Sequence, residues 1–143
     1  MKKIISIILA IIGCIGLLTS CGDPSPNTDD FEFVIQDPAL TASCGETIEY
    51  SAKLINKTNE EFVLSHGMPL IALYVYNYGE TPEEAVGASL IESTIDAGGF
   101  IEKNTSVCFT EPGDYMLRAF CVFSIDEKEF RYEIDPMKIS VSE

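Results

Sequence analysis

Apolar and polar residues alternate along most of the chain after residue 30, the pattern of β-strands with one buried face. Residues 47–56 show it most clearly, because apolar side chains alternate with Glu49, Ser51 and Lys53. That apolar face carries Ile48, Tyr50, Ala52 and Leu54. Similar runs occupy residues 31–36, 61–66, 70–78, 88–95, 100–109, 115–125 and 130–141. The pattern predicts about seven or eight short strands.

Two of these runs carry further information. Residues 115–125 are apolar on both faces, which predicts a central strand. Pro136 interrupts the last run and favours an edge strand or a bulge there. Turn residues separate the runs, and the turn at residues 57–59 predicts that residues 61–66 pair back onto residues 47–56. Short strands at this spacing, with one brief helix expected after Thr81, predict an all-β antiparallel sandwich.

The first 20 residues have a different character. Lys2 and Lys3 precede an apolar run over residues 4–18, the charged start and short apolar core of a secretory signal. The run is short for a membrane-spanning helix, which takes about 20 apolar residues. An uncleaved membrane helix with an incidental cysteine is the alternative, and the shortness of the run argues against it. We therefore expect a signal helix over residues 1–20.

The end of this leader, Leu18-Thr19-Ser20-Cys21, resembles the lipobox of bacterial lipoproteins. The resemblance implies that the thiol of Cys21 receives diacylglycerol and that cleavage falls just before it. Dual acylation gives stable membrane anchoring. The expected organisation is a signal peptide (1–20), a lipidated cysteine with a flexible tether rich in proline and acids (21–30), and one domain (31–143). The expected location is the cell membrane, lipid-anchored on its extracytoplasmic face.

The chain is strongly acidic. Nine Lys and Arg face 23 Asp and Glu, for a net charge of −14, and the loss of Lys2 and Lys3 with the leader makes the mature chain more acidic still. Such a surface repels nucleic acid and anionic lipid headgroups and keeps a tethered domain soluble. We expect no nucleic-acid partner.

Several local sequences resemble bacterial immunoglobulin-like domains, and in particular the intracellular proteinase inhibitor family of bacilli. They are Gly45-Glu46-Thr47, Asn56 and Thr58 at the next turn, Pro112-Gly113-Asp114-Tyr115, and Arg118-Ala119. The resemblance covers roughly residues 44–125. It implies an immunoglobulin-like sandwich in which Tyr115 anchors a corner to the backbone. It also implies protease inhibition in the envelope as an alternative function.

Catalytic and metal-binding patterns are scarce. His66 is the only histidine, and no nucleophile signature surrounds it, so we expect a strand-end histidine bonded to backbone. The acidic pairs Asp29-Asp30, Glu60-Glu61 and Glu83-Glu84 lack the spacing of a calcium loop. We expect no enzyme activity, no cofactor and no metal site, with cation-dependent adhesion through calcium between loops as an alternative.

Aromatic residues suggest a binding surface. Tyr74, Tyr76 and Tyr78 alternate with Leu73 and Val75, so the tyrosines project outward if the aliphatic residues are core. In an immunoglobulin-like topology the neighbouring strands add Arg118, Phe120 and Arg131 to that face. Rigid tyrosines beside arginine are typical of binding surfaces. The alternative is that residues 80–99 cover this face as a second small core.

Three cysteines follow Cys21, so at least one stays unpaired within a monomer. In an immunoglobulin-like topology Cys44 and Cys108 lie at the same end of two neighbouring strands, and any internal disulfide is expected between them. Cys121 is expected to be a buried thiol. The function predicted from these observations is a non-enzymatic, lipid-anchored envelope module that binds an unknown protein or glycan or acts as an accessory.

Overall fold

The computed structural model describes residues 25–82, 87 and 90–143. These residues form a short 3-10 helix, Thr28–Asp30, and nine strands. The strands are β1 (Phe31–Ile35), β2 (Thr41–Ser43), β3 (Thr47–Asn56), β4 (Phe62–His66), β5 (Ile71–Asn77), β6 (Ile91–Ile95), β7 (Phe100–Cys108), β8 (Gly113–Ile125) and β9 (Lys128–Ser142). The expected signal helix over residues 1–20 lies outside the described residues, as does most of the brief helix expected after Thr81.

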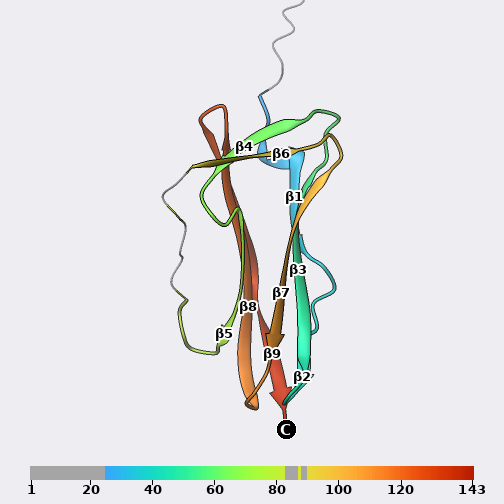
Figure 1. Cartoon of the computed structure of the whole chain (residues 1–143), viewed down its shortest axis with the longest axis vertical. Helices are drawn as coiled ribbons and strands as arrows, with labels where there is room; N and C mark the ends of the chain where they lie inside the picture. The colour runs from blue at the N-terminus through green and yellow to red at the C-terminus, as the bar shows by residue number, and fades with distance from the viewer. Residues whose placement is uncertain (1–24, 83–86, 88–89) are drawn as a thin grey trace, which may run out of the picture.

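The strands form two sheets packed face to face (Figure 1). One sheet has three strands in the order β1-β3-β7, and the other has the order β2-β9-β8-β4-β6 with β5 also paired to β8. All pairs are antiparallel except β2 with β9. The protein is an immunoglobulin-like antiparallel β-sandwich, as the sequence predicted, with β2 as the strand that the alternation missed.

Strand β8 lies in the middle of the larger sheet, as expected from a segment that is apolar on both faces. It pairs with β9 along one edge, and its other edge is shared by β5 and, near its end, by β4. The β8–β9 register shifts between Leu117, opposite Met137, and Ala119, opposite Ile134. Pro136 lies inside this irregularity, which confirms the bulge expected there.

The core lies between the sheets and is formed by alternate residues of the strands. On β3, Tyr50, Ala52 and Leu54 are buried, as the alternation predicted. At the end of the sandwich where the described chain begins, the ring of Phe31 packs 5.3 Å from Phe123 and 5.7 Å from Phe130, centroid to centroid. Aromatic contacts of this kind add to the apolar burial that holds the sheets together.

The expected pairing of residues 61–66 with residues 47–56 is wrong. Both edges of β3 are taken by β1 and β7, while β4 pairs with β6 and β8 in the other sheet. The segment between β3 and β4 therefore crosses from one sheet to the other. The buried Asn56 side chain ties this crossing together, because its Nδ2 donates to Glu60 O at 2.6 Å and to Asp96 O at 2.9 Å.

Residues 25–30, which precede β1, also differ from the flexible tether that their composition predicted. Pro26 is buried, and Asn27 caps the short helix in a reciprocal arrangement with Asp30. Two side chains from β9 hold the segment, since Lys128 Nζ donates to Pro26 O at 2.6 Å and Tyr132 Oη donates to Thr28 O at 2.9 Å. Composition missed this because the partners lie about 100 residues further along the chain. Among the described residues, no helix is long and apolar enough to cross a membrane.

Candidate functional site

The register of β5, β8 and β9 decides which side chains share the outer face of the larger sheet. Directly paired residues of an antiparallel ladder project to the same side. Tyr74 is paired with Arg118 across β5 and β8, and Arg131 is paired with Val122 across β8 and β9. Phe120 lies two residues from each of these β8 positions and so projects to the same side. The structure thus places these predicted site residues on one face.

Phe120 forms the floor of this face and is only 2% exposed. Three side chains surround its ring. The Tyr74 ring lies 6.0 Å away between centroids, the Arg118 Cζ lies 5.4 Å from the Phe120 centroid, and the Arg131 Cζ lies 5.2 Å from it. Cations placed over an aromatic face are attracted by its quadrupole. Phe120 is therefore a buried support for the arginines and Tyr74.

One carboxylate fixes both guanidinium groups. Arg118 Nε donates to Glu133 Oε1 at 2.9 Å, and Arg131 Nη2 donates to Glu133 Oε2 at 3.4 Å. The Arg118 hydrogen bond holds the pKa of Glu133 below its usual value, with Arg131 adding to the effect. The sequence did not single out Glu133 as a site residue, although its spacing from Arg131 and Asp135 places all three on the same polar face of β9. Its partnership with both arginines depends on the strand register.

The other tyrosines extend the face toward the far end of β5. Tyr76 is paired with Met116, and Tyr78 follows the last residue of β5 and is 66% exposed. Lys138 Nζ lies 5.8 Å from the Tyr78 ring centroid and 2.8 Å from Asp114 Oδ2. The hydrogen bond between Asp114 and Lys138 lowers the pKa of the Asp114 carboxyl and raises the pKa of the Lys138 amine. Part of the segment that we weighed as a cover for this face, residues 83–86 and 88–89, lies outside the described residues.

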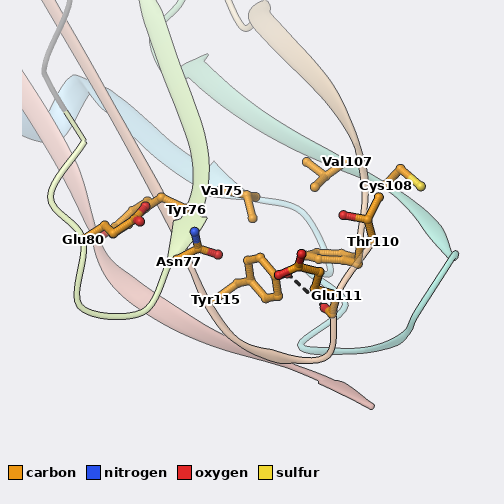
Figure 2. Close-up of a pocket in the computed structure, with 10 residues that line it drawn as sticks. Val75, Tyr76, Asn77, Glu80, Val107, Cys108, Thr110, Glu111 and Tyr115 are labelled. Atoms are coloured by element: carbon orange, nitrogen blue, oxygen red, sulfur yellow. Dashed lines mark hydrogen bonds between the residues drawn. The ribbon is translucent and has the colours of Figure 1, made fainter. Parts of the chain in front are cut away.

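A cleft of about 410 Å³ opens between β5 and β7, which belong to different sheets. Figure 2 shows Val75 and Val107 on opposite walls, with the Tyr115 ring between Asn77 and Glu111. The carboxylates of Glu80 and Glu111 lie on opposite sides of the cleft (Figure 2). The other lining residues are Tyr76, Cys108, Phe109 and Thr110.

Tyr115 shapes the floor of this cleft. Its Oη donates to Glu111 O at 3.0 Å, and its ring packs edge-on against Phe109 with centroids 5.0 Å apart. This confirms the corner-anchoring role that the resemblance to immunoglobulin-like domains implied. The cleft itself was not predicted, because its two walls come from strands that meet only when the sheets pack.

His66 is buried, and both ring nitrogens have partners. Nδ1 lies 2.6 Å from Gly67 O, and Nε2 lies 2.8 Å from Ser93 Oγ. The expectation of a strand-end histidine bonded to backbone is confirmed. Within residues 25–82, 87 and 90–143 there is no group of three or more His, Cys, Asp or Glu side chains arranged to hold a metal ion.

The disulfide expected between Cys44 and Cys108 is not formed in the structure, where both residues and Cys121 are free thiols. Cys44 packs against the core, whereas Cys108 is exposed. Strand alternation is the reason, because Val107 and Phe109 take the inward positions of this segment. Cys121 is buried as expected, and burial raises the pKa of its thiol to about 12.

Comparisons with solved structures return other β-sandwich domains. A CARDB domain from Pyrococcus furiosus, solved in complex with di-metal ions, is 13% identical over 79% of this chain and 93% of its own, with a TM-score of 0.46. PapD-like domain 7 of human CEP192 is 15% identical over 81% of this chain and 86% of its own, with a TM-score of 0.43. These are similarities of fold. No protein-family model matches the sequence, and no curated protein matches it.

Proposed function

We propose that this protein is a non-enzymatic binding module, anchored by lipid on Cys21 to the extracytoplasmic face of the cell membrane. The anchor rests on the Leu18-Thr19-Ser20-Cys21 sequence at the end of the leader. The binding role rests on one structural observation. Tyr74, Arg118 and Arg131 are gathered around the buried ring of Phe120 on the outer face of the larger sheet.

This arrangement supports binding because its polar groups are already ordered. Glu133 and the Phe120 ring fix the two guanidinium groups, so little side-chain freedom is lost when a ligand arrives. Tyr74 and Tyr76 are half-buried and belong to a regular strand, which restricts their rotamers as well. Rings beside fixed donors and acceptors suit a glycan or a polar protein surface.

The test uses the full-length lipidated protein in detergent micelles. Immobilised peptidoglycan and surface polysaccharides are the glycan probes, and a display library of folded protein domains is the protein probe. Tyr74→Ala and Tyr76→Ala are the test variants. Phe100→Ala is the matched control, because Phe100 is an exposed aromatic residue on the other sheet.

Truncating a ring at the centre of an interface costs binding about 2 kcal/mol or more, roughly a thirtyfold loss of affinity. We expect a loss of this size in both tyrosine variants and unchanged binding in the control. Binding that survives both tyrosine changes would place the ligand elsewhere. The absence of binding to every probe would count against the proposal.

A further inference from the structure

The folded domain holds its own N-terminal segment only a few residues after the proposed lipid anchor. Pro26 is buried, and its carbonyl accepts a hydrogen bond from Lys128 Nζ at 2.6 Å. Two residues later the Thr28 carbonyl accepts one from Tyr132 Oη at 2.9 Å. We call these two contacts the latch. They join the start of the domain to β9, more than 100 residues away.

Local contacts complete the segment between the latch and β1. Asn27 Oδ1 accepts from Asp29 N at 2.9 Å, and Asp30 Oδ2 accepts from Asn27 N at 2.8 Å. Lys57 N then donates to Asp30 O at 2.8 Å. Burial raises the pKa of Tyr132 to about 12, and the Tyr132 hydroxyl is the donor of the second latch bond. The chain is therefore fixed from Pro26 onward.

The latch lies at one end of the sandwich and the cleft at the other. In Figure 1 the described chain begins at the top, beside the turn between β8 and β9, while the C-terminus lies at the bottom. Tyr115, on the floor of the cleft, and Ile125, at the end of β8 nearest the latch, belong to the same strand. Ten residues of strand between them span about 33 Å at ~3.3 Å per residue.

We propose that the latch shortens the tether so that the domain stands with its β8–β9 turn toward the membrane and presents the cleft away from it. The inference rests on the lipid anchor of the proposed function. Five residue steps from Cys21 to Pro26 reach at most about 18 Å, against about 32 Å for nine steps if the chain were free to Asp30. The cleft between β5 and β7 then opens on the side of the domain that lies away from the lipid headgroups.

The negative charge of the domain opposes both its insertion into the membrane and an orientation in which it lies flat on the membrane surface. The end that carries the latch is rich in acidic residues, namely Asp29, Asp30, Glu60, Glu61, Asp126 and Glu127. The remainder of the chain is also acidic. Anionic headgroups repel such a surface within a Debye length, about 8 Å at physiological ionic strength. The short tether limits how far the near end can move away, and repulsion keeps the long sides of the sandwich off the bilayer.

Energy transfer to the membrane tests the stance. The lipidated protein is placed in phosphatidylethanolamine–phosphatidylglycerol vesicles that carry an acceptor lipid. One donor is attached to the exposed Cys108 in a Cys44→Ser background. The other is attached at Asp126→Cys in a background that also contains Cys108→Ser. Vesicle flotation of each sample first establishes the anchor.

We expect much stronger transfer from position 126 than from position 108. Equal transfer, or stronger transfer from position 108, in protein that floats with the vesicles would overturn the stance and leave the anchor intact. Protein that does not float would instead overturn the lipid anchor, so the two failures are distinguishable.

Proteolysis tests the latch itself. An endoprotease that cuts before aspartate reports the exposure of the bond before Asp29, and its cleavage before Asp114 reports global unfolding. Lys128→Ala and Tyr132→Phe each remove one latch bond and should speed cleavage before Asp29 roughly fivefold, with cleavage before Asp114 unchanged. The matched controls Lys103→Ala and Tyr78→Phe should cleave like wild type. Unchanged cleavage before Asp29 in both latch variants, or a parallel rise before Asp114, would contradict the latch.

Discussion

Arg118 and Glu133 meet across β8 and β9, where the guanidinium donates to Glu133 Oε1 from Nε at 2.9 Å and from Nη2 at 2.5 Å. The second oxygen of the same carboxylate accepts from Arg131. One carboxylate therefore sets the positions of two cations over the Phe120 ring. Because hydrogen bonds between ionised groups are stronger than neutral ones, this pairing orders the outer face even though it is open to solvent.

The first prediction concerns Glu133→Gln. The Arg118 interaction lowers the folded-state pKa of Glu133, so its contribution to stability is present at neutral pH and is lost as the pH falls through that lowered pKa. Solvent screening keeps the contribution small, below about 1 kcal/mol. Urea unfolding should show a slightly less stable variant at neutral pH and no difference in strong acid. A difference that persists in strong acid would contradict the ion-pair explanation.

The second prediction concerns Asn56→Ala. The change removes the Nδ2 donor to the carbonyls of Glu60 and Asp96, and it removes the Oδ1 acceptor of the Thr58 N hydrogen bond at 3.0 Å. Buried polar groups left without partners cost about 1–3 kcal/mol each, and partial rehydration lowers the sum. We expect the free energy of unfolding to fall by roughly 2–4 kcal/mol in urea titrations.

The control for Asn56 is Thr58→Val, which removes only the hydroxyl contacts of the same turn, including Thr58 Oγ1 to Asn56 Oδ1 at 2.8 Å. It should cost clearly less than Asn56→Ala. Equal losses from the two variants would mean that the amide does not hold the crossing between the sheets.

The alternation of apolar residues was enough to predict most of the fold. It identified β3 with its limits and inward face, and it identified β8 as the central strand. Both succeeded because a strand buried on one face has apolar residues at alternate positions, and a strand buried on both faces is apolar throughout. It did not predict that β4 leaves the sheet of β3. That depends on the competition for the edges of β3, which β1 and β7 occupy. Such competition is a property of the whole chain.

The candidate site was predicted only where strand register matched alternation. Tyr74, Arg118, Phe120 and Arg131 were expected together because each faces outward on neighbouring strands, and the register places them so. Alternation also suggested an exposed Phe120, whereas the side chains above it leave it 2% exposed. The cleft between β5 and β7 and the latch on Pro26 depend on contacts between distant segments, which no local pattern encodes.

The third prediction concerns the anchor. Cys21→Ala should abolish metabolic labelling by palmitate and leave an unprocessed precursor, because the thiol that accepts the lipid is gone. Cys14→Ala is the matched control, since this second leader cysteine lies within the apolar run rather than at its end. It should be labelled and processed like wild type. Label retained by the Cys21 variant would show that the lipobox resemblance is misleading.

The fourth prediction ranks the thiols of the folded protein by their reactivity with iodoacetamide. Cys108 is exposed and should react first, followed by the half-buried Cys44. Cys121 is buried, and a thiol with a pKa of about 12 carries almost no thiolate at pH 8, so it should react only after unfolding. Mass spectrometry of peptides after timed alkylation measures each rate. Cys108→Ser should remove the fast phase alone. Without reductant the protein should retain its thiols, because Cys44 faces the core and Cys108 faces solvent. A peptide that contains a Cys44–Cys108 disulfide would refute that arrangement.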